Sequence, residues 1–300
     1  MDLTKSQMTT AACPASAEHV IEDIVLRHSS RGMNILQQYL APDYCRKAAD
    51  DILKLKRGSV LLTTGFFVAG YAETDGPLGT VSVAQALKNL GFTPVIVTDE
   101  ICRDLFEPED LSVEYVELSS GADTYEQLLD RYDPVCLISI ERCGRNLNQE
   151  YANMRGISIT AQTASIDTMF DLARSRHILT IGIGDGGNEI GMGNVKDIIS
   201  EKLELNPCTV PVDDLIIATV SNWGAYGLAA YLSILANVYI LPAYQVIASY
   251  LNRIVALGCV DGVLKKPQPT VDGFSAAVEE EILDALNSYV SNVLHAQQEL

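Results

Sequence analysis

The chain has 300 residues, of which 48% are hydrophobic, and its mean hydropathy is +0.13; this composition supplies a sizeable core and excludes an intrinsically disordered chain. Its formal net charge is -18, from 39 acidic and 21 basic residues. Nucleic acid and anionic membranes are therefore not expected as partners, because both are bound through basic patches.

The N-terminal part of the chain is predicted to be helical. About the first 17 residues are polar and small and are expected to be frayed. Residues 16–57 carry apolar side chains at spacings near 3.6 residues, as at Ile21, Ile24 and Val25. We predict a helical N-terminal extension over residues 1–57, packed on a main α/β domain over residues 58–300.

From residue 59 the pattern alternates between short apolar runs and helical segments. Strands are expected at 59–64, 94–98, 112–116, 135–140, 178–183 and 215–220, and helices at 80–90, 123–132, 165–175 and 188–205. Two apolar helices and a C-terminal helix from residue 274 follow. The apolar run at 225–241 is interrupted by polar residues, which favours a buried helix over a membrane span. This alternation predicts an α/β fold with a doubly wound, mostly parallel, Rossmann-like sheet.

Four of the predicted strands, at 59–64, 135–140, 178–183 and 215–220, end in clusters of Gly and polar residues. In an open parallel sheet, ligands bind beyond the carboxyl ends of the strands. We therefore predict that Gly65, Glu141, Gly184 and Ser221 lie together at one edge. Such a shared pocket is typical of an enzyme or a ligand-binding domain.

The loop at 182–187 reads GIGDGG and matches the dinucleotide fingerprint G-x-G-x-x-G. It follows a late strand and lacks the expected acid at the end of the next strand, so NAD is not expected. The glycines would serve a tight turn, or the loop would bind substrate or a metal. In the second case backbone N–H groups of Gly186 and Gly187, at the start of a helix over 188–205, would hold a carboxylate. Asp185 and Glu189 would then be acid/base groups or metal ligands.

Three further loops contain candidate functional residues, and two of these loops allow two interpretations each. In the sequence ERCGRN at 141–146, Arg142 or Arg145 would clamp a substrate carboxylate, or the loop is an exposed one whose ion pairs contribute little. The sequence ETDGP at 73–77 lies in a long loop that would form a lid, or Asp75 only stabilises a turn. At 221–224, Ser221 or Asn222 is expected to cap a helix.

The cysteines indicate a reducing compartment. There are seven, and none forms a C-x-x-C pair, so a disulfide framework or zinc ribbon is not expected. With no secretory signal visible at the N-terminus, we predict a cytoplasmic protein. Most cysteines should be small core residues, but Cys143 is in a strand-end loop near arginine and would be a reactive thiolate if exposed.

The same segments carry a resemblance to a known family. LTTGF at 62–66, ETDGPLG at 73–79, ERCG at 141–144, NMRG at 153–156 and GIGDGGNEIGMG at 182–193 resemble the C-terminal domain of D-glutamate cyclases. The resemblance covers roughly residues 30–295, and the string at 184–193 is long and specific. It implies a hydro-lyase that converts D-glutamate to 5-oxo-D-proline and water.

The implied reaction closes a lactam when the substrate amine attacks the side-chain carboxyl carbon, which requires a folded substrate and an acid/base pair. Asp185 and Glu189 are the predicted catalytic pair, with Glu141 or Asp75 in reserve. Asp185 and Glu189 are also the predicted ligands of a divalent cation, Mg²⁺ or Mn²⁺. The predicted substrate-binding residues are Thr64, Gly65, Asp75, Arg142, Arg145, Gly184, Gly186, Gly187, Asn188 and Asn222.

The alternative interpretation is a non-catalytic small-molecule or nucleotide-binding domain that lacks the partner domain of the longer family members. An anionic small molecule is the expected ligand in the catalytic interpretation. A homo-oligomer is compatible with the sequence.

Overall fold

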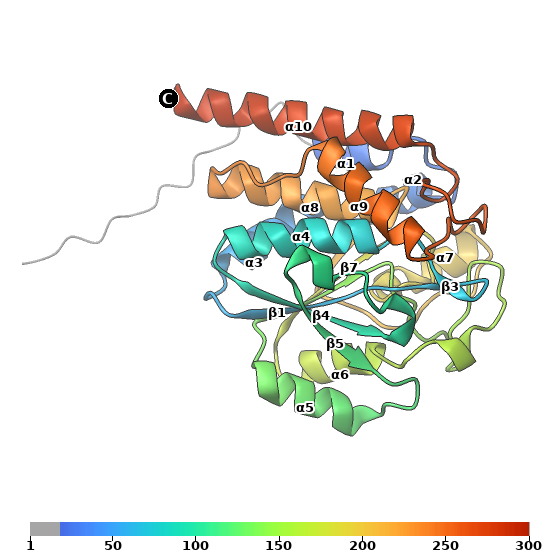
Figure 1. Cartoon of the computed structure of the whole chain (residues 1–300). Coiled ribbons are helices and arrows are strands. Elements are labelled where there is room, and N and C mark those ends of the chain that lie inside the picture. The colour runs from blue at the N-terminus through green and yellow to red at the C-terminus, as the bar shows by residue number, and fades with distance from the viewer. Residues whose placement is uncertain (1–18, 300) are drawn as a thin grey trace, which may run out of the picture.

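Parallel strands form the central sheet of the computed structural model, which describes residues 19–299 (Figure 1). The six strands of this sheet are β1 (Ser59–Thr63), β4 (Thr93–Asp99), β5 (Ser112–Val116), β6 (Cys136–Ile140), β7 (Leu179–Gly184) and β8 (Asp214–Ile217). Their spatial order is β5-β4-β1-β6-β7-β8, and every pairing is parallel. The predicted doubly wound, Rossmann-like sheet is confirmed. The frayed segment predicted for about the first 17 residues lies outside the described residues.

The strand order reverses between β1 and β6, which pair through Leu62 and Ile138. The chain builds outward from β1 to β5 on one side and from β6 to β8 on the other. All five residues of β6 are buried, as expected for a parallel strand that is covered on both faces. A doubly wound sheet binds ligands at this reversal, outside the carboxyl ends of the strands.

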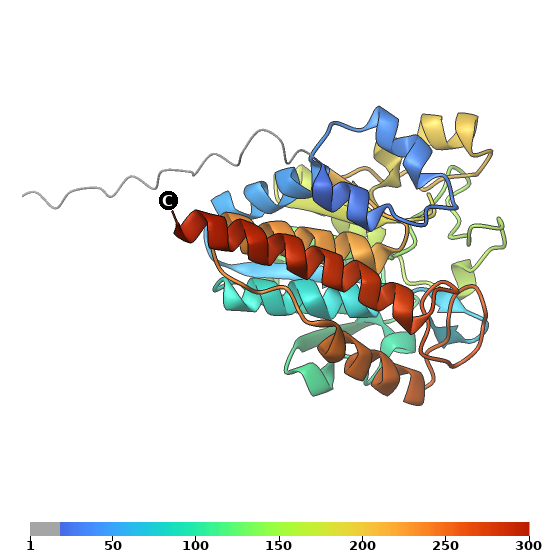
Figure 2. The same cartoon turned by 90° about the horizontal axis from the view of Figure 1, so that it is seen from above.

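Helices cover both faces of the sheet (Figure 1). The helices α3 (Tyr44–Lys54), α4 (Pro77–Asn89) and α8 (Ser221–Ala236) lie on one face, and α5 (Ala122–Tyr132) and α6 (Asp167–Ser175) lie on the other. Two helices, α1 (Val20–Val25) and α10 (Ala276–Gln298), form a further layer over α8. Figure 2, viewed from above, shows α10 running along the molecule on the near side of α8. The remaining elements include α2 (Met33–Leu36), α7 (Lys196–Lys202), α9 (Tyr244–Ala256) and a hairpin of β2 (Phe67–Val68) and β3 (Tyr71–Ala72).

The helix α8 is the centre of the helical layers. It is apolar around nearly its whole circumference, because it packs on α4, α3, α1 and α10. The indole N–H of Trp223 in α8 donates a 2.6 Å hydrogen bond to buried Glu279 of α10. The apolar run that contains α8 is therefore a buried helix. None of the described helices is both long and apolar enough to cross a bilayer.

The N-terminal helices share the core of the α/β part. Ile21 and Val25 of α1 and Ala48 of α3 belong to the same continuous apolar cluster as the sheet and α10. Their helical character is as predicted. The division of the chain at residue 57 into an extension and a main domain stays a prediction.

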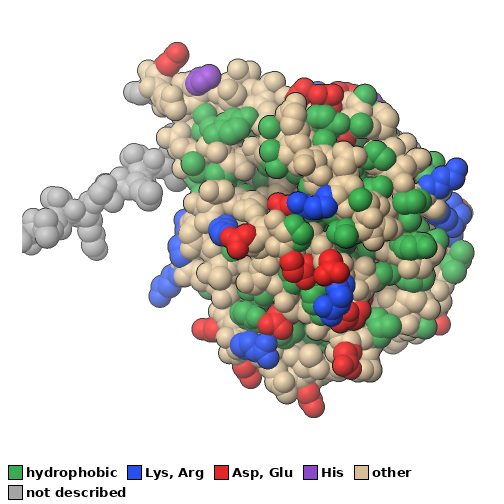
Figure 3. Space-filling view, viewed as in Figure 1, with side chains coloured by type: hydrophobic (Ala, Val, Ile, Leu, Met, Phe, Trp, Pro, Cys, Tyr) green, Lys and Arg blue, Asp and Glu red, His purple; other side chains and the backbone are tan. Residues whose placement is uncertain are grey.

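Charged side chains of both signs are interspersed on the face seen in Figure 3. Lys and Arg lie singly or beside Asp and Glu on that face, among exposed apolar side chains. Exposed ion pairs of the described chain include Lys88 with Asp110 and Arg103 with Glu100. The expectation that nucleic acid is not a partner stays a prediction.

Candidate active site at the carboxyl edge of the sheet

The four predicted strand-end loops meet at the carboxyl edge. The Ser221 hydroxyl donates to the Glu141 carboxylate at 2.5 Å, the Glu141 N–H donates to the Ile183 carbonyl next to Gly184, and Arg142 donates to the Gly65 carbonyl. Glu141 has φ +48°, a conformation that costs free energy in a non-glycine residue and is often found at functional sites. The predicted convergence of these loops is confirmed.

Six carboxyl groups gather at this edge, and we call them the acid cluster. They are Glu73, Asp75, Glu141, Asp185, Glu189 and Asp272. Oxygen atoms of Asp75, Asp185 and Asp272 lie within 4.8 Å of one another, and so do those of Glu141, Asp185 and Glu189. Asp185 is common to both groups and is 1% exposed. It is the centre of the cluster.

Burial dominates the acidity of this cluster. It raises the pKa of Asp75, Asp185 and Asp272 to about 8 each, and a neighbouring carboxylate adds to the rise in every case. Burial also raises the pKa of Glu73 and Glu141 well above the usual range. Several of these groups therefore exchange protons near neutral pH, which suits acid/base catalysis.

Among residues 19–299, one arginine forms ion pairs with the cluster, and it comes from the segment between α1 and α2. The Nη1 atom of Arg31 lies 2.9 Å from Oδ1 of Asp185 and 2.8 Å from Oδ2 of Asp272. The second oxygen of Asp185 has no hydrogen-bond partner although it is buried. Arg31 thus neutralises part of the charge, and one buried acceptor of Asp185 keeps no partner within the described protein.

Asp75 and Asn222 hold two helix N-termini together. The Asp75 carboxylate accepts the backbone N–H groups of Ser221 and Asn222 at the start of α8, at 3.0 and 2.8 Å. In return, Oδ1 of Asn222 accepts the N–H groups of Gly76 and Gly79 at the start of α4, at 2.9 and 2.7 Å. The expectation that Ser221 or Asn222 caps its own helix is wrong, because the N-cap residue is Val220 and its side chain makes no capping bond.

The Gly-rich loop after β7 folds around Glu189. The backbone N–H groups of Asp185, Gly186 and Gly187 donate to its carboxylate at 3.3, 2.7 and 2.8 Å. These amides were expected to hold a substrate carboxylate at a helix N-terminus, but a carboxylate of the chain itself fills that position. The predicted helix over 188–205 is wrong in its first part, because residues 188–191 form a loop, a 3₁₀ turn covers Met192–Asn194 and α7 spans only Lys196–Lys202.

The glycines of this loop are explained by contacts within the protein. A Cβ on Gly182 would lie 2.4 Å from the carbonyl oxygen of Ile190, and Gly187 has φ +97°. Gly184 lies against Glu189 and Met192. The tight-turn interpretation of the G-x-G-x-x-G pattern accounts for these positions, and the loop follows the fifth strand of the fold rather than the first.

Arg142 is a buried structural residue rather than an exposed clamp. Its guanidinium is 1% exposed and donates to Asp99 at 2.7 Å, to the Ala164 carbonyl at 2.9 Å and to the Gly65 carbonyl at 3.0 Å. The expectation of exposure is wrong because β6 delivers this loop into the interior, where Arg142 joins three segments. A role in substrate binding stays a prediction.

Arg145 and Cys143 also differ from the exposed loop that the sequence suggests. Arg145 pairs with Asp167 at 2.9 Å and with Asp171 at 2.5 Å, and its side chain is 23% exposed. Cys143 is buried, which raises its thiol pKa to about 12. This environment disfavours a reactive thiolate. The six described cysteines are all free and buried, as predicted for core residues.

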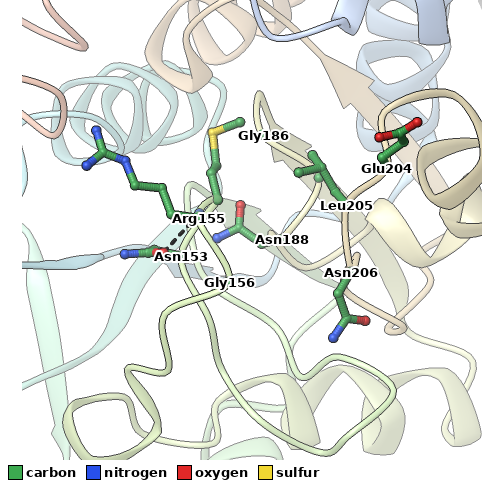
Figure 4. Close-up of a pocket in the computed structure, with 10 residues that line it drawn as sticks. Asn153, Arg155, Gly156, Gly186, Asn188, Glu204, Leu205 and Asn206 are labelled. Carbon is green, nitrogen blue, oxygen red and sulfur yellow. Dashed lines mark hydrogen bonds between the residues drawn. The ribbon is translucent and has the colours of Figure 1, made fainter.

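Thr64 and Asn188 lie on different sides of the site. Thr64 is buried behind the cluster, and a Cβ on Gly76 would lie 2.4 Å from its hydroxyl. Asn188 lines a cavity of about 230 Å³ together with Gly186 and Gly187 (Figure 4). The predicted substrate-binding residues are thus divided between the buried edge and this cavity.

The acid cluster offers oxygen ligands of the kind that Mg²⁺ and Mn²⁺ prefer. Both oxygens of Glu189 and of Asp75 already accept backbone N–H groups. Asp185 keeps one oxygen without a partner, and Asp272 lies at the more open side of the cluster. Among the described residues, Asp185 and Asp272 therefore fit a divalent cation best.

The raised pKa values predict how stability depends on pH. A carboxyl group whose pKa rises from about 3.9 in the unfolded chain to about 8 here stabilises the fold fully below pH 4 and loses that contribution as pH rises through 8. Arg31, Asp185, Asp75 and Glu73 all interact with Asp272, so its acidity depends on these neighbours. With chelator present, we expect a lower melting temperature near pH 9 than near pH 6.

The matched variants for this prediction are Asp272→Asn and Asp284→Asn, which change the net charge equally. Asp284 is exposed on α10. Calorimetric melting temperatures should fall less steeply with pH in Asp272→Asn than in Asp284→Asn or the unmodified chain. Identical slopes in all three proteins would show that Asp272 keeps its ordinary acidity.

Arg31 and Asp272 escape sequence reasoning, and Glu73 is noted only as part of the ETDGP loop and not as a site residue. Arg31 belongs to the predicted helical extension, and Asp272 to the connection between the last two helices. The only local signal is the Asp-Gly dipeptide at 272–273, which indicates a turn. Asp272 and Gly273 both have positive φ in the structure. The Asp-Gly dipeptide predicts a turn but not its position against β7, because that position results from tertiary packing.

Comparisons with known proteins identify relatives. The profile of a family described as "D-glutamate cyclase-like, C-terminal" matches residues 21–287. D-glutamate cyclase, mitochondrial, of Homo sapiens is 34% identical over 222 residues, which cover 66% of this chain and 35% of the human protein. The chain thus matches only about a third of that relative. The expected cytoplasmic location stays a prediction.

Solved structures show only distant likeness. A glycosyltransferase from Rickettsia africae ESF-5 has a TM-score of 0.29 and 14% identity, covering 54% of this chain and 43% of its own. The Bordetella bronchiseptica enzyme WbmH, in complex with NAD⁺, has a TM-score of 0.31 and 10% identity, covering 60% and 53%. At these scores neither structure bears on the ligand or the reaction of this chain.

Proposed function

The chain belongs to the D-glutamate cyclase-like C-terminal family, and from this premise we propose that it converts D-glutamate to 5-oxo-D-proline and water. The observation that carries the proposal is the acid cluster, in which three carboxyl groups have a pKa of about 8. It lies at the strand reversal, where a doubly wound sheet binds its ligand.

The reaction moves two protons within the site. The substrate ammonium must lose two of its three protons, the nitrogen bonds to the side-chain carboxyl carbon, and one carboxyl oxygen leaves with both protons as water. Groups with a pKa near neutrality can accept and return these protons. Asp185 is the best candidate, because its buried second oxygen has no partner and it is shared by both carboxylate groups.

The other cluster residues have positioning roles in this proposal. Glu189 shapes the loop that carries Asp185, since three backbone N–H groups converge on it. Glu141 is held by Ser221 and Asp75 by the start of α8. Arg31 is the cation that would meet a substrate carboxylate, because its guanidinium already bridges two carboxylates and is partly exposed.

A divalent cation on Asp185 and Asp272 would supply charge neutralisation for the substrate carboxylates and the leaving oxygen. It would also compensate for the excess of acids over the single Arg31. A non-catalytic binding domain is the alternative function. It is favoured by the near-complete burial of Asp75, Asp185 and Glu189, which encloses the cluster in the described chain.

The test is turnover by the chain with D-glutamate, followed by chiral chromatography of 5-oxoproline, with Mg²⁺, Mn²⁺ or chelator. We expect 5-oxo-D-proline from D-glutamate and far less product from L-glutamate. A rise in melting temperature with D-glutamate, without product under any metal condition, would support the binding domain instead. L-glutamate, NAD and ATP serve as comparison ligands in that measurement.

A further inference from the structure

The acid cluster is enclosed within the described protein. Five of its six acids are at most 6% exposed, and the side chain of Asp272 is 5% exposed. A molecule of the size of an amino acid therefore cannot reach Asp185 unless a covering segment moves. The segment that reaches the cluster from outside the sheet is the connection between α1 and α2. Its residues 28–31 are called the strap here.

The backbone of the strap is weakly attached. None of the N–H or carbonyl groups of residues 28–31 forms a hydrogen bond with another described residue, and none of these four residues is buried. His28 at its start and Gly32 directly after it have φ +60° and +88°. Segments with few backbone hydrogen bonds and little buried surface open at a low free-energy cost, and such loop ends can serve as hinges.

Side chains fasten the strap at two points. At the inner point, Nη1 of Arg31 lies 2.9 Å from Oδ1 of Asp185 and 2.8 Å from Oδ2 of Asp272. At the outer point, Nε2 of His28 lies 3.1 Å from Oε2 of Glu281 on α10. The Arg31 side chain is 22% exposed, so water can compete for it when the pairs separate. A segment fastened in this way can leave the surface without breaking the core.

The single tryptophan of the chain lies against the strap. The ring centroid of His28 is 6.4 Å from that of Trp223, and the ring of Phe274 is 5.1 Å from it. Phe274 follows Asp272 by two residues. Trp223 is fully buried and is the only tryptophan in the sequence. Movement of the strap takes His28 away from the indole, so the fluorescence of Trp223 reports that movement.

We propose that the strap is a lid over the acid cluster, which opens to admit the substrate and is latched by Arg31. In the closed lid, Arg31 pairs with Asp185 and Asp272. Opening releases both carboxylates, and closure over the substrate brings Arg31 to a substrate carboxylate and excludes water, as active-site lids do. The proposal rests on the proposed function only in taking the cluster as the place where the substrate reacts.

The experiment is acrylamide quenching of Trp223 fluorescence without substrate. The lid variants are Arg31→Met, which removes the inner fastening, and Glu281→Gln, which weakens the outer one. The controls Arg174→Met and Glu280→Gln make the same charge changes outside both fastenings. We expect the quenching constant to rise about twofold or more in Arg31→Met, because a partly buried charge-assisted contact is lost. It should rise less in Glu281→Gln, whose pairs are exposed, and stay unchanged in the controls.

Tryptic cleavage after Arg27, directly before the strap, is a readout that does not depend on the indole. Both lid variants should be cut there faster than their controls, because cleavage follows the population of the open form. Near-ultraviolet circular dichroism checks that Arg31→Met is folded. If it is not, the comparison of Glu281→Gln with Glu280→Gln decides.

Equal quenching and equal cleavage in the lid variants and their controls would overturn the proposal. So would faster cleavage at all tryptic sites alike, because that indicates global loosening rather than a lid. Turnover measured alongside separates the two proposals. A strap that opens as expected in a chain without product contradicts only the proposed function, whereas unchanged quenching and cleavage in an active chain contradict only the lid.

Discussion

Asp185→Asn should lower the turnover of D-glutamate by about 10²-fold or more and leave the fold intact. The amide cannot take a proton from the substrate amine, so the step that depends on Asp185 is lost. Stability should change little, because Asn has nearly the same shape as Asp and its Oδ1 can still accept the hydrogen bond from Arg31. Initial rates and melting temperatures of the two proteins test this.

Asp284→Asn is the control, since it removes one exposed charge from α10. Turnover of Asp185→Asn within twofold of the unmodified chain would remove Asp185 from the chemistry. Helix capping cannot explain a loss, because α7 begins only at Lys196. Glu189→Gln is a less specific probe, since it also breaks hydrogen bonds that shape the loop.

Arg142→Met should lower the free energy of unfolding by about 3–5 kcal/mol, because it leaves the buried charge of Asp99 without its partner. The carbonyls of Gly65 and Ala164 also lose their donor. This expectation reverses the interpretation of Arg142 as an exposed substrate clamp, which predicts a large effect on affinity and a small one on stability. Urea denaturation measures the difference directly.

Two further variants control for the charge. Arg174→Met at an exposed position of α6 should change stability by no more than about 0.5 kcal/mol. Adding Asp99→Asn to Arg142→Met should recover part of the loss, because the uncompensated charge disappears. If Arg142→Met lowers the free energy of unfolding by less than about 1 kcal/mol, the Arg142–Asp99 pair contributes no more than a surface ion pair.

The sheet and its carboxyl edge could be predicted from the sequence because they depend on local patterns. Continuous apolar runs such as β6 give buried parallel strands, and the Gly and polar residues after them mark the ligand edge. The helix over 188–205 was predicted wrongly because Ile190, Met192 and Val195 have apolar spacing that also fits a buried loop. The three backbone N–H groups that donate to the Glu189 carboxylate stabilise the loop rather than a helix.

The composition of the site could be predicted only in part. Asp185, Glu189, Glu141 and Asp75 are adjacent to strand ends or glycines, and the structure brings them together. Arg31 and Asp272 come from distant segments whose local sequences carry no chemical signal. The burial of Arg142 was missed because the local sequence shows the charges of the loop but does not show that Asp99, at the end of β4, forms an ion pair with Arg142.

Asp75 accepts amides at the start of α8, and Asn222 accepts amides at the start of α4. These reciprocal hydrogen bonds set an order on the folding of the protein during its synthesis. A ribosome makes Asp75 and α4 long before α8, since the two residues are 147 positions apart. Until Asn222 leaves the exit tunnel, the amide of Gly79 lacks its acceptor, the amide of Gly76 has only the neighbouring Asp75 carboxylate, and that carboxylate lacks the two amides at the start of α8. The start of α4, in the first crossover of the sheet, thus gains its full set of hydrogen bonds only after the last strand and α8 have been made, and the Asp75 part of the carboxylate site is completed at the same late stage.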